Sequence, residues 1–84
     1  MRKPVVTLYV NEPMGRKCQA NFAAAAHARD AFGVELVIVK DTSADYRPGV
    51  DPPVASVALD GTLLVQQDTI TFEELQAAIL RARR

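Results

Sequence analysis

Hydrophobic residues along the chain form continuous runs, which favour strands, and also recur at the period of a helix face. Val5–Val10 is a run of β-branched and aromatic residues with little polarity, which favours a central strand buried on both faces. From Met14 to Phe32 apolar residues recur at spacings of three, four or seven, the period of one helix face. Gly33 follows as a residue that commonly ends a helix. The chain therefore begins with a predicted strand and a predicted helix.

A second apolar run and a polar segment come next. Val34–Val39 predicts a strand, and the order strand, helix, strand predicts a parallel pair joined by a right-handed crossover. Asp41–Pro53 is rich in Asp, Ser, Gly and Pro and predicts a loop, with one helical turn at Ser43–Tyr46.

The last third of the chain predicts a hairpin and a helix. Val54–Leu59 and Thr62–Val65 flank Asp60-Gly61, the dipeptide favoured in type I′ turns, so these strands are expected to be antiparallel. Thr71 and Glu74 have the spacing of a capping box, which predicts a helix start. Ile70 and Leu75 are placed as its hydrophobic staple, and the expected buried stripe is Phe72, Leu75, Ala78, Ile79 and Ala82.

These elements predict an α/β fold of order βαβ-loop-ββα. We expect a mixed four-stranded sheet with two main helices, either on one side of the sheet or one on each side. The length of 84 residues predicts a single domain over residues 1–84, since a second core could not bury enough surface. A hydrophobic content of 49% is enough to build one core.

Charge and composition mainly exclude certain partners and locations for the chain. Ten Lys and Arg residues balance ten Asp and Glu residues, so no long-range field favours nucleic acid or anionic lipid as a partner. No run of 18 apolar residues is present to span a membrane. A lone cysteine cannot form an intramolecular disulfide, and a reducing cytoplasm is the expected location.

Candidate metal and acid–base chemistry is sparse. The chain holds one cysteine, one histidine and scattered carboxylates, so no metal site and no resident cofactor are expected. His27 falls on the helix face away from Cys18, which argues against a Cys-His catalytic pair and for a solvated histidine. Tyr9 and Tyr46 are expected to be packing residues.

The order of elements and a set of short motifs resemble the thioredoxin superfamily, and its small glutaredoxin-like members most. Val6–Tyr9 resembles the first glutaredoxin strand, and Gly49–Pro53 resembles the lead into the family's cis-proline. Pro53 and Gly61 have the spacing that thioredoxins show from that proline to the hairpin glycine. The resemblance covers the chain from Val5 to about Leu80. It implies a cis-proline before the third strand and, here, a second family helix reduced to a loop or short turn.

The family's C-x-x-C motif at the helix start is degenerate in this chain. One registration is Gly15-Arg16-Lys17-Cys18, with Cys18 in the resolving position and glycine where the attacking cysteine stands in the family. The other is the monothiol motif Cys18-Gln19-Ala20-Asn21. The first is favoured, because the second leaves a long loop between Val10 and Cys18.

The registration decides the chemistry that the resemblance implies. A thiol in the first position sits at the exposed helix N-terminus, where it is activated as a thiolate, and Arg16 and Lys17 would add positive charge. A thiol in the second position is shielded and acts on a mixed disulfide made by the first. Free cysteines are also often buried core residues. Both a reactive and a buried Cys18 remain open at this point.

The resemblance also implies a groove for a substrate or partner, formed by Gly15, Arg16, Lys17, Pro52 and Pro53. In the family, the residue before the cis-proline pairs through its backbone with a peptide or glutathione. Pro52 has no N–H, so if Pro53 is the family proline the groove loses that donor. If Pro52 takes the role instead, Asp51 supplies the N–H together with a negative charge.

Three functions follow as hypotheses, and whether the chain is an enzyme stays open. The first is a thiol-redox protein in which Cys18 forms a mixed disulfide with glutathione or a partner, without standard dithiol exchange. The second is a non-catalytic adaptor that keeps the fold as a protein-binding surface, as a monomer or as a weak homodimer through an exposed edge strand. The third is capture of a small anion at the first helix N-terminus.

Overall fold

The computed structural model describes residues 3–82, which form four strands and two helices. These are β1 (Val5–Val10), α1 (Arg16–Phe32), β2 (Glu35–Lys40), β3 (Ser56–Leu59), β4 (Thr62–Val65) and α2 (Phe72–Ala82). The predicted order is confirmed. α1 and β3 start two residues later than predicted, because Gly15 is extended (φ −78°, ψ −175°) and Ala55 has a positive φ of 66°, which is not a strand conformation.

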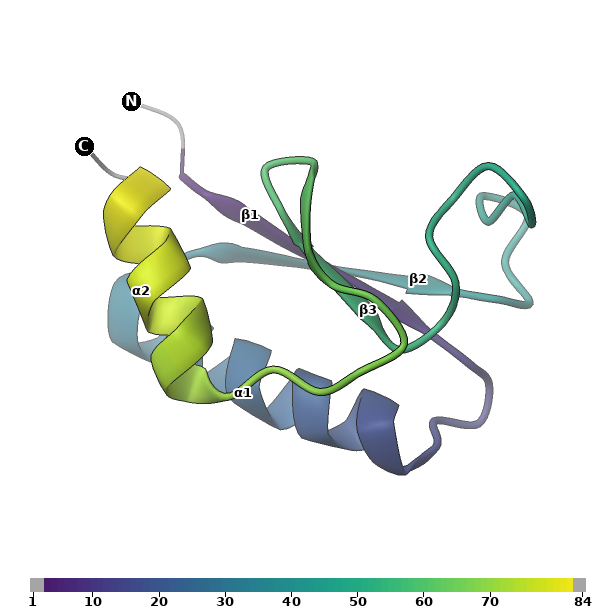
Figure 1. Ribbon diagram of the computed structural model, residues 1–84, viewed down its shortest axis with the longest axis horizontal. Helices are drawn as coiled ribbons and strands as arrows, with labels where there is room; N and C mark the ends of the chain where they lie inside the picture. The colour runs from purple at the N-terminus through teal and green to yellow at the C-terminus, as the bar shows by residue number, and fades with distance from the viewer. Residues whose placement is uncertain (1–2, 83–84) are drawn as a thin grey trace.

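The strands form one mixed sheet in the order β2-β1-β3-β4, which confirms the predicted four-stranded sheet (Figure 1). β1 is parallel to β2 and antiparallel to β3, and β3 and β4 are antiparallel. Leu8, at the middle of β1, pairs with Ile38 on one side and Val57 on the other. β1 is therefore an inner strand, while β2 and β4 are the two edges.

Both helices lie on the same face of the sheet. α1 packs against β1, β2, β3 and α2, and Figure 1 shows the two helices side by side. Burial along β1 alternates accordingly. Val6, Leu8 and Val10 are almost fully buried, whereas Val5, Thr7 and Tyr9 are half-buried. The prediction that this strand is buried on both faces is therefore wrong.

The half-exposed face of the sheet results from the connection between β2 and β3. This connection, residues 41–55, contains turns and no helix, which confirms the loop predicted for Asp41–Pro53. One turn is closed by the Tyr46 N–H, which donates to the Ser43 carbonyl at 3.1 Å. No element of the described chain thus covers this face as the helices cover the other.

The core lies between the sheet and the helices. Leu75 and Ile79 of α2 are fully buried, and Ala25 and Ala28 bring α1 close to the strands. The remaining buried core side chains come from β1, β3, the two helices and the segments beside them: Val6, Leu8, Val10, Cys18, Ala24, Val34, Ala55, Val57, Leu59, Ile70 and Ala78. Leu36 of β2 and Leu64 and Val65 of β4 are partly buried and pack against this core.

The predicted turn and helix ends are confirmed. Asp60 and Gly61 have positive φ values of 50° and 85°, as a type I′ turn requires. The Glu74 N–H donates to the Thr71 hydroxyl at 3.1 Å, and the Thr71 N–H donates to the Glu74 carboxylate at 3.0 Å. Gly33 ends α1 with a left-handed backbone and donates its N–H to the Arg29 carbonyl at 2.8 Å.

Candidate functional site

Cys18 lies one turn inside the first helix. Gly15 is the residue that precedes α1, and its φ of −78° is open to any amino acid. Cys18 is the third residue of the helix and is only 2% exposed. This position fits the registration in which Gly15 takes the first place of the motif and Cys18 the second.

Asn11 holds the segment between β1 and α1. Its Oδ1 atom accepts a hydrogen bond from the Cys18 Sγ at 3.2 Å and another from the Gly15 N–H at 3.0 Å. The thiol hydrogen is therefore engaged inside the protein rather than offered to solvent. Sequence reasoning missed Asn11. The available signal was an asparagine directly after a strand and four residues before the glycine that precedes a helix, a position where its side chain bonds the local backbone.

Asn21 is a second amide whose structural role was not predicted from the sequence, and unlike Asn11 it is buried. It is 1% exposed, and its side chain reaches the segment between β4 and α2. The Asn21 Nδ2 donates to the Asp68 carbonyl at 3.0 Å, and its Oδ1 accepts from the Ile70 N–H at 2.8 Å. Asn21, the last residue of the alternative motif Cys18–Asn21, thus joins α1 to the segment between β4 and α2.

A small hollow of about 250 Å³ lies beside the start of α1. It brings together the predicted Gly15, Arg16, Lys17 and Cys18 with three residues that were not predicted, Asn11, Val54 and Ala55. Arg16 and Lys17 are exposed. The Lys17 Nζ already has a hydrogen-bond partner, since it donates to the Gln67 carbonyl at 3.0 Å.

Pro52 and Pro53 lie elsewhere. They line a separate hollow of about 490 Å³, formed with Tyr46 and residues 48–51 of the same loop and with Leu63 and Gln66. The residues beside Cys18 are Val54 and Ala55 instead. The five residues of the expected groove are therefore split between two places.

The expectation of a cis bond before Pro53 is wrong. Within residues 3–82 the cis peptide bond is Glu12–Pro13. The chain enters β3 through Ala55, whose φ is 66° and whose N–H donates to the Tyr9 carbonyl at 2.7 Å. The Pro53 carbonyl accepts from the Ser56 hydroxyl at 2.6 Å.

Tyr9 and Tyr46 pack on each other across the half-exposed sheet face. Their ring centroids lie 6.5 Å apart, and the Tyr46 hydroxyl donates to the Pro52 carbonyl at 3.0 Å. Burial and then the nearby Asp51 carboxylate raise the pKa of Tyr9 above its usual value. Tyr9 is thus a neutral phenol at physiological pH, in a packing position.

His27 is exposed and stacks on Phe72 of α2, with ring centroids 3.7 Å apart. The His27 ring therefore packs between α1 and α2 and does not approach Cys18. Within residues 3–82, no group of three or more His, Cys, Asp or Glu side chains could hold a metal ion. Neither α1 nor α2, the helices of that range, is both long and apolar enough to cross a membrane.

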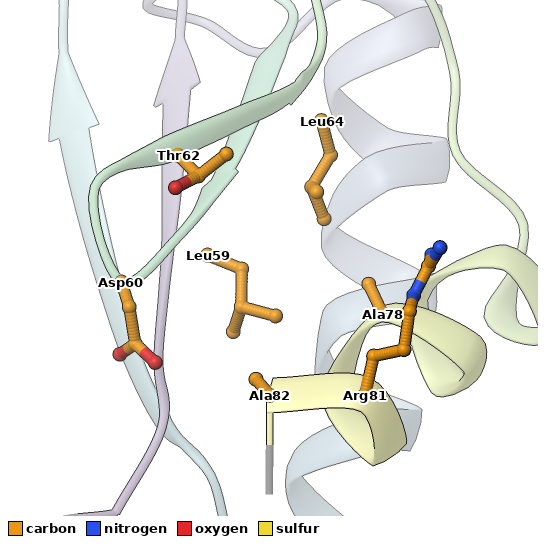
Figure 2. A pocket seen from close by; sticks show the side chains of 7 residues that line it. All are labelled: Leu59, Asp60, Thr62, Leu64, Ala78, Arg81 and Ala82. Carbon is orange, nitrogen blue, oxygen red and sulfur yellow. The ribbon is translucent and has the colours of Figure 1, made fainter. Parts of the chain in front are cut away.

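A third hollow lies at the opposite end of the sheet (Figure 2). It has a volume of about 430 Å³ between the β3–β4 hairpin and α2. Leu59, Leu64 and Ala78 give it an apolar floor, and Asp60 and Arg81 stand at its rim. Asp60 has a structural task there, since its Oδ1 accepts the Val5 N–H at 2.8 Å. None of the predicted site residues lies in this hollow.

The outer edge of β2 is open. The N–H groups of Glu35 and Asp41 donate inward, to the carbonyls of Pro4 and Val10 at 2.9 Å each. Backbone groups alternate sides along a strand, so those of Leu36, Ile38 and Lys40 point away from β1. β2 pairs with β1 alone among the described strands.

The side chains of β2 leave this edge accessible. Lys40, the one basic residue of the strand, pairs with Glu12 at 2.8 Å. Ile38, at the centre, is 39% exposed. Natural edge strands are usually guarded by charges, prolines or bulges. The central residues Leu36–Val39 have none of these.

No family model, no curated protein and no solved structure matches this chain. Its functional assignment therefore rests on the geometry of its own residues.

Proposed function

We propose that this chain is a thioredoxin-like domain that binds an extended segment of a protein partner along β2 and does not catalyse dithiol–disulfide exchange. The observation that supports it most is the open edge of β2. Leu36, Ile38 and Lys40 turn their N–H and C=O groups outward, where an added strand would pair with them.

Strand addition suits the side chains of β2 as well. Main-chain hydrogen bonds supply affinity in this binding mode, and alternating side chains supply specificity. Val37 and Val39 lie on the half-exposed sheet face, while Leu36 and Ile38 lie on the helix side. An extended partner segment would therefore find apolar neighbours on both faces.

The environment of Cys18 supports a non-catalytic role. Dithiol exchange starts with an exposed nucleophile, and Gly15 occupies the position where the family's attacking cysteine stands. Cys18 is buried and donates to Asn11. A buried sulfur is poorly placed to attack a disulfide in solution.

A thiol-redox role is the second candidate, and the hollow beside Cys18 favours it. The hollow is bordered by Cys18 together with the exposed Arg16, whose charge would attract an anionic thiol compound weakly, and with Lys17, whose ammonium already donates to the Gln67 carbonyl. In this role the Cys18 thiolate would attack glutathione disulfide, form a mixed disulfide and release one glutathione thiolate. A cytoplasmic location is proposed for either role.

Anion capture at the start of α1 has less support. The Gly15 N–H, which such a site would use, donates to Asn11. The Lys17 ammonium donates to the Gln67 carbonyl. Both groups already have partners, and Arg16 alone is a weak anion site.

The two candidates predict different alkylation rates for Cys18. We expect the native thiol to react with iodoacetamide about a hundredfold more slowly than in the denatured chain, because labelling requires local opening. The Arg16→Cys variant places a thiol at an exposed position of the same turn and serves as the fast reference. Labelling of Cys18 at the reference rate would favour the redox role instead.

A photo-crosslinker at position 38 tests the binding role directly. We expect benzoylphenylalanine at this position to give a discrete crosslinked product in extracts of the cells that make the protein. The Cys18→Ala variant should give the same product, since the edge does not involve the thiol. The same crosslinker at the exposed Glu73 of α2 is the control. Absence of a product specific to position 38 would overturn the proposal.

A further inference from the structure

We infer that the segment that pairs with β2 is the β2 strand of a second copy of this chain, in antiparallel register about Ile38. This inference rests on the proposed strand addition at the β2 edge. It goes further by naming the occupant and the residue at the two-fold axis.

The hydrogen-bonding pattern selects the register. Antiparallel strands exchange two hydrogen bonds between residues whose N–H and C=O groups face each other. On β2 these residues are Leu36, Ile38 and Lys40. If Ile38 faces Ile38 of the second copy, Leu36 faces Lys40, and all three outward residues are paired in both copies. A shift by two residues in either direction leaves one of the three unpaired.

The side chains agree with this register. Residues opposite each other in antiparallel strands point to the same face, and here an even-numbered residue always meets an even-numbered one. Val37 meets Val39 on the half-exposed face, and the two Ile38 side chains, each 39% exposed, meet on the helix side. Leu36 meets the aliphatic stem of Lys40, whose charge Glu12 compensates.

The charges at the strand ends keep the dimer weak. In this register Glu35 faces Asp41 of the second copy at each end of the pairing, and like charges opposite each other are destabilising. The other sheet edge offers no equal alternative. β4 has four residues, and its ladder with β3 is irregular between Val57 and Ala58. The β2 edge is therefore the better one for pairing between copies.

Disulfide trapping in the purified protein tests the register. In an antiparallel hydrogen-bonded pair the Cα atoms lie about 5.5 Å apart, within the range that a disulfide spans. We expect the Ile38→Cys variant to form a covalent dimer on mild oxidation at least about tenfold faster than Leu63→Cys. Leu63 is equally exposed, at 39%, and lies on the opposite edge strand, so it is a matched control.

Removing the end charge should strengthen the dimer. We expect Glu35→Gln to tighten dimerisation by about three- to tenfold in analytical ultracentrifugation, because two like-charge pairs are relieved. Glu73→Gln removes the same charge from exposed α2 and should leave the dimer unchanged. Because both variants remove one negative charge, tighter dimerisation in Glu35→Gln alone would be an effect of the position of Glu35 and not of net charge.

The outcomes separate this inference from the proposed function. Equal trapping at positions 38 and 63, or faster trapping at Val37 than at Ile38, overturns the register about Ile38. A monomer at all concentrations overturns the second copy as the partner. If the photo-crosslinker at position 38 still gives a product with another protein, strand addition at β2 survives. If neither experiment gives a product, both proposals fall.

Discussion

The Gly15→Cys variant is expected to close a disulfide with Cys18 and to gain dithiol chemistry that the natural chain lacks. The new side chain fits, since φ at Gly15 is −78° and a Cβ there would lie 3.6 Å from the nearest Asn11 atom, an ordinary contact. A thiol at this point sits at the helix N-terminus, where the free N–H groups lower a thiol's pKa. Cys18, one turn along, then becomes the resolving thiol.

The measurement is the count of free thiols after oxidation by glutathione disulfide, with insulin reduction as the activity. We expect the oxidised variant to show no reactive thiol in the folded or denatured state and to lose two hydrogens in mass. The control is Arg16→Cys, which adds a thiol one residue along, at an exposed position. Two free thiols in denatured Gly15→Cys after oxidation would show that Cys18 cannot act as a resolving cysteine, and the proposed likeness to a redox motif would lose its main support.

The fold was largely predictable because its signals are local. The apolar runs of the strands, the turn at Asp60-Gly61 and the capping box of Thr71 and Glu74 each depend on neighbouring residues, and the presence of each predicted element is confirmed. The parallel pairing of β1 with β2 followed from the rule that a helix joins parallel neighbours, whereas the position of β3 beside β1 was not predicted. The placement of both helices on one face did not follow, because it depends on what covers the second face.

The candidate site was less predictable because its contacts are distant in sequence or made by amides. Asn11 and Asn21 have no apolar period and no charge, so their roles emerge only when α1 packs against the loops. Pro53 was expected beside Cys18 because the resemblance to the thioredoxin superfamily, carried in part by its spacing to Gly61, implies it. The backbone reaches β3 through Ala55 instead, which moves the proline into another hollow.

The edge position of β2 could not be predicted from its sequence either. The sequence of β2 resembles that of a buried strand, since four consecutive apolar residues suit an inner position. Only the sheet order places it at an edge. An apolar strand that has only one neighbouring strand supports the proposed binding of a partner, so the proposed function depends on the position of β2 in the sheet.

Replacing Asn21 by alanine is expected to cause a large loss of stability. The substitution leaves the Ile70 N–H and the Asp68 carbonyl without their partner, and Asn21 and Ile70 are 1% and 5% exposed. The buried Ile70 N–H that is left unsatisfied costs about 1–3 kcal/mol, whereas Asp68 is exposed and its carbonyl can turn to water, so the loss of that second hydrogen bond costs less. We expect the free energy of unfolding to fall by about 2–4 kcal/mol, measured by urea denaturation. A domain of 84 residues has only about 4–12 kcal/mol in total.

The control for Asn21→Ala is Gln19→Ala in the same helix. Gln19 also makes a side-chain hydrogen bond, from its Nε2 to the Met14 carbonyl at 3.0 Å, but it is exposed. Water replaces an exposed bond, so we expect Gln19→Ala to change the free energy of unfolding by less than about 0.5 kcal/mol. If the two variants were equally stable, Asn21 would not tie α1 to the segment before α2. Burial of the amide is thus the property that separates a structural bond from a surface bond in this helix.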